Sequence, residues 1–120
     1  MSATMGGMRW FSTLALRSSV DEAVDVLSLP LADQLRADPD LLVAFVAPSY
    51  REHFARLAEK LQARFPNAAL LGCSAGGVIG AGREIEREPA ISLVGAVLPG
   101  VLVRPFHVPP RGVPPPEAGP

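Results

Sequence analysis

The densest group of residues that could do chemistry in this sequence lies between positions 72 and 82. Five of these eleven residues are glycine, and they surround Cys73 and Ser74. Glycines let successive backbone N–H groups approach a small anion or carboxylate, because no side chain stands in the way. The segment therefore predicts a loop that binds a ligand through its backbone, with Ser74 as a hydroxyl partner and Cys73 lining the site.

The predicted ligand-binding residues are those of this loop, together with the nearest acidic residue of the charged run that follows it. They are Gly72, Cys73, Ser74, Gly76, Gly77 and Glu84. Each has a plainer alternative role. The glycines can simply permit turns with positive φ, the thiol can be a small buried group at a strand end, and residues 83–88 can form a solvated connector.

The same segment matches a motif of serine hydrolases. Residues 72–76 fit G-x-S-x-G, and the order Ser74, Glu84, His107 fits the chain order of that triad. That motif requires a helix directly after the serine, whereas the glycines of residues 76–80 disfavour one. Hydrolysis at Ser74 is therefore a minor alternative, and we predict no enzyme activity.

Other cofactor chemistry has little support. There is no G-K-[ST] motif, and the glycines miss the dinucleotide-binding spacing. One cysteine excludes a disulfide framework and a cysteine-based zinc cluster. A lone histidine such as His107 can ligate haem, but it is far more often a surface residue. We therefore expect no cofactor and no metal, with haem as the minor alternative.

The apolar pattern predicts the elements that must position the loop. Strands are expected at residues 9–17, 41–47, 68–71, 90–98 and 101–108. Two amphipathic helices are expected, opening at capping boxes formed by Ser19 with Glu22 and by Ser49 with Glu52. Pro30 predicts a kink in the first helix, or two short helices.

The order β-α-β-α-β-loop-β-β predicts an α/β fold with a mixed sheet of about five strands and two helices. The central strand 41–47 is apolar on both faces, as if between two helical layers. The last two strands are expected to pair as a hairpin around residues 99–100. Ligands of such sheets bind beyond the carboxyl ends of the strands, where the glycine loop begins.

Length and charge narrow the function further. The 120 residues allow one domain, at residues 9–108, between disordered tails at 1–8 and 109–120; six of the last twelve residues are proline. A net charge of −1 gives no electrostatic case for nucleic acid. The longest apolar run, residues 41–47, is too short for membrane insertion. The absence of a signal peptide predicts a cytoplasmic protein.

These features together resemble a known family. Residues 70–80, followed by Arg83-Glu84-Ile85, are similar to the signature of the FIST N-terminal domain. Residues 41–48, 91–98 and 105–107 resemble neighbouring segments of that domain, so the resemblance covers about residues 10–108.

The resemblance implies a non-catalytic cytoplasmic sensory domain for signal transduction that binds a small, amino-acid-like ligand. It also implies that this chain covers a truncated FIST N-terminal domain and lacks the FIST C-terminal half. We therefore expect a signalling output domain, the missing half or self-association to complete it. An open sheet edge gives the main alternative, a protein-interaction or dimerisation module without a complete ligand site of its own.

Overall fold

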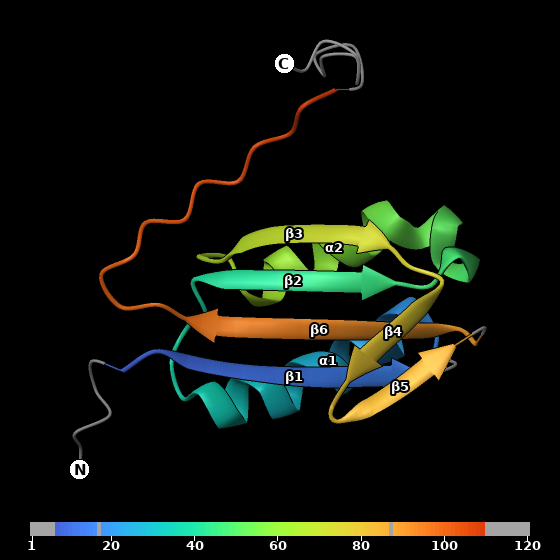
Figure 1. Cartoon of the computed structure of the whole chain (residues 1–120), viewed down its shortest axis with the longest axis horizontal. Helices are drawn as coiled ribbons and strands as arrows, with labels where there is room; N and C mark the ends of the chain where they lie inside the picture. Colours follow the sequence, from blue (N-terminus) through green and yellow to red (C-terminus); the bar gives the residue numbers. More distant parts are fainter. Residues whose placement is uncertain (1–6, 17, 87, 110–120) are drawn as a thin grey trace, which may run out of the picture.

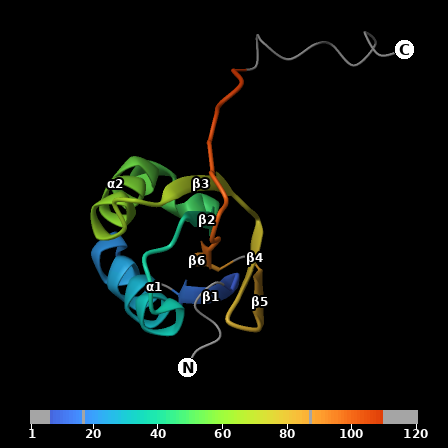
Figure 2. The same ribbon diagram turned by 90° about the vertical axis from the view of Figure 1, so that its left-hand side faces the viewer.

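The computed structural model describes residues 7–16, 18–86 and 88–109. A four-stranded mixed sheet carries two helices on one face and a small two-stranded hairpin on the other (Figures 1 and 2). The elements in chain order are β1 (Arg9–Leu16), α1 (Val20–Leu35), β2 (Leu41–Val46), the short 3₁₀ helix η2 (Pro48–His53), α2 (Phe54–Arg64), β3 (Ala69–Ser74), β4 (Gly77–Gly80), β5 (Arg83–Glu86) and β6 (Ala90–Val97). The structure thus confirms an α/β fold with a mixed sheet and two helices.

The strand order β1-β6-β2-β3 differs from the chain order in one important respect. The last strand, β6, inserts between β1 and β2 and runs antiparallel to both. In the part of the chain that the structure describes, β3 pairs only with β2, to which it is parallel. Among the described residues, β1 and β3 are therefore the two edges of the main sheet.

The core lies between the sheet and the two helices. α1 begins at Ser19, whose Oγ accepts a hydrogen bond from the backbone N–H of Glu22 at 3.2 Å and donates one to its carboxylate at 3.0 Å. Apolar residues three and four apart then face the sheet. The largest fully buried apolar side chains are Leu27, Leu31, Leu35, Leu42, Leu61, Ile91 and Leu93.

Two contacts set how closely α1 approaches the sheet. The Thr13 hydroxyl of β1 donates to the carbonyl oxygen of Leu27 at 2.9 Å, in a buried position. On β6, a β-carbon at Gly95 would lie 2.9 Å from both terminal methyls of Leu31. The helix therefore packs directly onto the backbone of β6, and only glycine fits there without movement.

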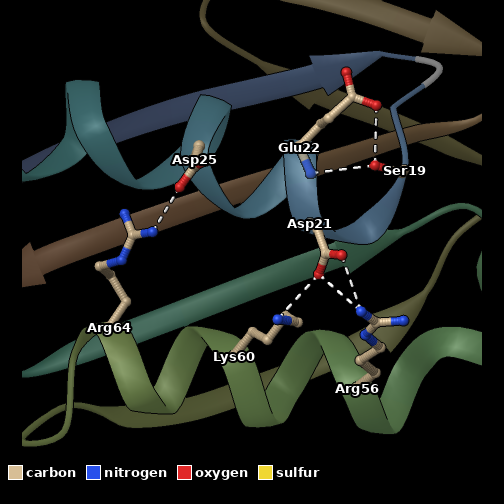
Figure 3. A network of polar contacts seen from close by, with 7 residues as sticks. All are labelled: Ser19, Asp21, Glu22, Asp25, Arg56, Lys60 and Arg64. Carbon is tan, nitrogen blue, oxygen red and sulfur yellow. Dashed lines mark hydrogen bonds and ion pairs between the residues drawn. The ribbon is translucent and has the colours of Figure 1, made fainter.

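A polar network joins the exposed sides of the two helices (Figure 3). The carboxylate of Asp21 accepts from Arg56 Nη2 at 2.9 Å and lies 3.0 Å from Lys60 Nζ. Asp25 pairs in the same way with Arg64 at 2.6 Å. The hydrogen bond from Lys60 has the largest effect and, together with the charges of Arg56 and Lys60, holds the pKa of Asp21 below its usual range; desolvation acts in the opposite direction. These bridges link α1 to α2 along the surface.

The β4–β5 hairpin covers the other face of the sheet over β1 and β6. The Ser92 hydroxyl donates to the carbonyl oxygen of Ile79 at 2.5 Å, and the N–H of Ala81 donates to Ser12 Oγ at 3.1 Å. Gly80 is so close that a β-carbon there would lie 2.9 Å from the backbone oxygen of Thr13. The hairpin, and not a second layer of helices, thus covers this face of the sheet over two of its four strands.

Three sequence predictions about the strands were wrong. Residues 72–82 are not one loop, because β3 continues to Ser74 and most of the remainder forms β4 and its turn. Residues 83–86 are a strand rather than a charged connector. Residues 101–108 form no strand, and leave the sheet after a turn in which the N–H of Val101 bonds the carbonyl of Leu98 at 3.1 Å.

The helix signals turn out differently. Pro30 does not divide its segment into two short helices, because it lies within the single helix α1, where its solvent-facing position leaves the carbonyl that it cannot bond open to water. Ser49 and Glu52 form no capping box, because Pro48 starts the 3₁₀ turn one residue earlier and makes Ala47 the cap.

The central strand is not enclosed by two helical layers either. Both helices lie on one face of the sheet, so Phe45 and Leu71 on the other face remain 36% and 41% exposed. In the part of the chain that the structure describes, no helix is both long and apolar enough to cross a membrane. The two predicted tails fall mainly on residues 1–6 and 110–120, outside the described residues.

Candidate functional site

Half of the predicted ligand-binding residues lie together at the carboxyl end of β3. Gly72, Cys73 and Ser74 are its last three residues, and all are exposed. β3 lies at the edge of the sheet: it pairs with β2 on one side and, among the described residues, with no strand on the other. The motif is therefore presented on a strand edge and not on a separate loop.

The hydrogen bonds of the β2–β3 ladder determine which backbone groups of β3 are free. The N–H of Ala69 donates to the carbonyl of Asp40 at 3.0 Å, and the N–H of Ala75 donates to the carbonyl of Val46 at 2.9 Å. Because strand residues point alternately left and right, every second N–H and C=O between them points away from β2. The outward residues are Leu70, Gly72 and Ser74.

The same alternation places the side chains of the outward residues on the helix-facing side of the sheet. Leu70 is paired with the buried Leu42, and Gly72 with the buried Ala44. Because Gly72 has no side chain, space remains between β3 and α2. The free backbone groups of β3 thus border an unfilled region beside the helix.

That region is a groove of about 240 Å³ between α2 and the β2–β3 edge. Its lining is apolar apart from the backbone of the motif. The lining residues are Ala44, Val46, Phe54, Leu57, Ala58, Leu61, Leu70, Gly72 and Cys73. No charged side chain lines the groove, so a charged ligand group would have to be bound by the backbone of β3.

The other predicted residues lie elsewhere. Gly76 borders a separate hollow of about 270 Å³, together with Ser49 and Glu88, beyond the carboxyl end of β2. Gly77 pairs with Glu86 in the hairpin, and Glu84 pairs with Ile79. The hairpin extends across the sheet toward β1, the edge opposite β3 (Figure 1). The structure therefore divides the predicted site into a β3 group and a hairpin group.

The glycines do not form the backbone nest that the sequence favoured. Among the described residues, positive φ occurs at Gly82 and Gly100 but at none of the glycines from 72 to 80. Anion-binding nests need successive residues of opposite handedness. The N–H groups available at Gly72 and Ser74 are instead those of an unpaired strand edge.

The arrangement also lacks the parts of a serine hydrolase. After Ser74 the chain continues into β4, so the strand–turn–helix of a nucleophile elbow is not formed. His107 is exposed on the segment beyond β6, and His53 lies at the end of η2; neither borders the groove. Within residues 7–16, 18–86 and 88–109, no three His, Cys, Asp or Glu side chains gather as a metal site.

Sequence reasoning missed the helix side of the groove. Phe54, Leu57, Ala58 and Leu61 are recognisable as the apolar face of a helix, which predicts core packing alone. A signal for the groove was nevertheless present in the small residues that lie around this helix face. Ala44 lies beside Gly72 in the ladder and Ala58 lines the α2 side of the groove, and three small residues at one place leave space in a core.

Comparison with family models gives a match over more than half of the chain. The family model described as the FIST N domain matches residues 40–103, which is 64 of the 120 residues of the chain. The match begins just before β2 and includes α2, β3, the hairpin and β6, and hence most of the groove lining. Neither the curated proteins nor the solved structures contain a match to this chain.

Proposed function

The chain belongs to the FIST N domain family, and from this we propose that it is a non-catalytic sensory domain that binds a small, amino-acid-like ligand in the groove between α2 and β3. The family supports the sensory role. The geometry supports the place and the ligand chemistry. The observation that carries the proposal is an apolar groove of about 240 Å³ directly beside free backbone groups of Gly72 and Ser74.

An amino acid matches both parts of this surface. The outward N–H groups of Gly72 and Ser74 can donate to a carboxylate, and the outward carbonyls of Leu70 and Gly72 can accept from an ammonium group. Such main-chain recognition is how an extended peptide binds a sheet edge, and an amino acid carries the same groups in a smaller unit. The hydroxyl of Ser74 adds one further partner.

The groove lining selects among amino acids. Phe54, Ala58 and Leu70 are the partly exposed lining residues and would contact the ligand side chain, and burial of apolar surface contributes about 25 cal/mol per Å². A charged side chain would lose its water there without gaining a partner. The preferred ligand is therefore an amino acid, or a similar small carboxylate, with an apolar side chain of the size of leucine or phenylalanine.

A thermal-shift series tests the proposal. Purified chain is heated with L-leucine, L-phenylalanine, L-glutamate, L-lysine and the matching amino-acid amides. Ligand at a hundred times its Kd adds about 2.7 kcal/mol of stability, which raises the Tm of a domain of this size by several degrees. Leucine or phenylalanine should shift the Tm, whereas the charged amino acids and the amides should not. A Tm that no small carboxylate changes would contradict the proposal.

The second candidate is a protein-interaction module, for which the free edge of β3 is the specific support. We also propose that the protein acts in the cytoplasm as one part of a signalling protein, with an output domain as partner. A fluorophosphonate probe checks the non-catalytic part of the proposal, because an activated serine at position 74 would be labelled.

A further inference from the structure

We propose that two copies of this chain associate by strand addition, in which residues 101–108 of one copy pair antiparallel with the edge strand β3 of the other. The apolar side chains of the added strand would fill the groove between β3 and α2. This goes beyond ligand binding, because it assigns a role to a segment that makes no strand within its own copy.

The first observation is that β3 has none of the usual protection of an edge strand. Natural edges carry charges, prolines or bulges, or are covered by other elements, since an open row of N–H and C=O groups invites pairing with another chain. β3 reads Ala-Leu-Leu-Gly-Cys-Ser, with no charge and no proline, and it pairs with β2 without an interruption of the register. Its outer side is therefore a ready template for another strand.

The second observation is the segment that follows β6. After the turn at residues 98–101 the chain extends away from the sheet (Figures 1 and 2). Four large apolar side chains of this segment are exposed: Val101 by 52%, Leu102 by 75%, Phe106 by 84% and Val108 by 47%. Such a stretch is costly to leave in water, and it already has the extended form of a strand.

Pro105 determines which residues of the added strand can form hydrogen bonds with β3. Proline has no backbone N–H, so in an added strand its nitrogen must point away from β3. The residues on either side of it, Arg104 and Phe106, then direct their N–H and C=O groups toward β3, and so does Leu102. Each of these can exchange hydrogen bonds with the outward groups of β3.

The choice of hydrogen-bonded residues also decides which side chains of the added strand face the groove. In an antiparallel pair, two residues that exchange hydrogen bonds lie opposite each other with their side chains on the same face. The outward residue Gly72 has its α-carbon on the helix-facing side, over the groove. Leu102, Arg104 and Phe106 would therefore lie on that side. The exposed apolar surface of Leu102 and Phe106 would meet the apolar lining, and the aliphatic stem of Arg104 between them would lie along the open groove with its guanidinium group in water.

Pairing of the segment with β3 of its own copy does not bring Leu102 and Phe106 to the groove. The segment leaves β6 at the end of the sheet where β3 begins, with β2 between the two strands, because β6 is antiparallel to β2 and β2 is parallel to β3. Folding back onto its own β3 would make it run parallel, and its β3-bonded residues would then point to the face away from the helices. The groove is filled by Leu102 and Phe106 only when the strand runs antiparallel, which a second copy allows.

Sedimentation velocity on the full chain without ligand, across a hundredfold range of concentration, tests the association. The wild type should show concentration-dependent dimers. Leu102→Asp and Phe106→Asp should reduce dimer formation at least tenfold, since a carboxylate would enter an apolar groove. His107→Asp, on the opposite side of the added strand, should retain it. A wild type that stays monomeric at all concentrations would overturn the proposal, as would dimers that Phe106→Asp leaves intact.

Disulfide trapping tests the antiparallel pairing through the positions that share a face with Cys73. Cys73 is the one cysteine of the chain, and its side chain lies on the face opposite to the groove. New cysteines at Val101, Val103 or His107 share that face in the added strand, so oxidation should join one of them to Cys73 of another copy. A cysteine at Arg104 should not cross-link. Cross-linking at position 104 in preference to all three would exclude the antiparallel pairing.

The segment variants leave the groove itself unchanged. They therefore separate this inference from the proposed ligand binding: a chain that stays monomeric can still show the ligand-dependent Tm shift, and a dimer can form in a chain that binds no amino acid. A ligand in the groove would compete with Leu102 and Phe106, which is why the association is measured without one.

Discussion

A β-carbon placed on Gly72 would lie 3.3 Å from the carbonyl oxygen of Ala44, its partner in the β2–β3 ladder. That spacing is tighter than most real contacts of a β-carbon, and it lies at the floor of the groove. A side chain at position 72 would extend into the groove toward α2. The open groove therefore depends on glycine at this position.

Gly72→Val is expected to abolish the Tm shift caused by leucine or phenylalanine. The branched side chain would fill the groove, while the strand conformation suits valine. The variant should still unfold cooperatively, with a loss of about 1–3 kcal/mol from the tight contact. Thermal unfolding with and without ligand measures both effects.

Gly76→Ala is the matched control, because nothing lies within 4 Å of a β-carbon built on Gly76. It should keep the ligand response and the stability of the wild type. An unchanged response in Gly72→Val, or a lost response in Gly76→Ala, would place the ligand outside the groove.

Ser92→Ala is expected to loosen the β4–β5 hairpin without unfolding the sheet. Ser92 is fully buried, and its hydroxyl bonds the carbonyl of Ile79, so the variant leaves a carbonyl of the hairpin unpaired. A lost hydrogen bond of this kind costs about 0.5–1.5 kcal/mol. Hydrogen exchange by mass spectrometry should be faster in residues 77–86 and unchanged in β2. Equal acceleration in both would mean that the hairpin and sheet open together.

Thr13→Val is expected to destabilise the protein by about 1 kcal/mol, although valine has nearly the same shape. The variant removes the buried hydrogen bond from Thr13 to the carbonyl of Leu27, which joins β1 to α1. Urea unfolding of the variant beside Ser49→Ala, which removes an exposed hydroxyl outside the sheet, measures the difference. A Thr13→Val variant as stable as the wild type would show that water replaces the lost donor.

Acidification is expected to weaken the link between α1 and α2 at Asp21. Lys60 and Arg56 lower the pKa of this carboxyl in the folded state. A lowered pKa contributes stability above the unfolded-state pKa of about 3.9, and that contribution is lost as the pH falls through the folded-state value. Asp21→Asn should therefore have a lower Tm than the wild type at pH 6, and the two should converge near pH 2.

The effect should be small, because Asp21 is exposed and salt screens such pairs. Addition of 0.5 M NaCl at pH 6 should bring the two proteins closer. Asp38→Asn, outside the helix, controls for the general loss of a negative charge. A difference in Tm that persists at pH 2 would assign the effect of Asp21→Asn to something other than the ion pairs.

Local signals in the sequence predicted much of the fold. The strand predicted from the apolar run at residues 41–47 and the cap of α1 at Ser19 depend on neighbours in the chain; the structure confirms both, with β2 covering Leu41–Val46. The hairpin was missed because glycine disfavours strands, whereas its stability comes from distant contacts such as Ser92 with Ile79. The segment 101–108 has the composition of a strand, but composition does not supply a neighbouring strand to pair with.

The candidate site was predicted in part. Gly72, Cys73 and Ser74 stand out by residue type, and the structure places them together on β3. The groove beside them depends on β6 inserting between β1 and β2, which leaves β3 at the edge. Chain order does not reveal that insertion. In the fold, Glu84 lies in the hairpin and Gly72 in β3, although the two lie only twelve positions apart in the sequence.

The most direct test of ligand binding at the β3 edge is an NMR titration of ¹⁵N-labelled chain with L-leucine, recorded residue by residue. Binding at this edge should cause saturable shifts of the backbone N–H signals of Gly72 and Ser74 and of the α2 residues Phe54 and Ala58, with L-glutamate as an inactive control. Shifts confined to the hairpin residues 77–86, or no saturable shift with any apolar amino acid, would contradict it.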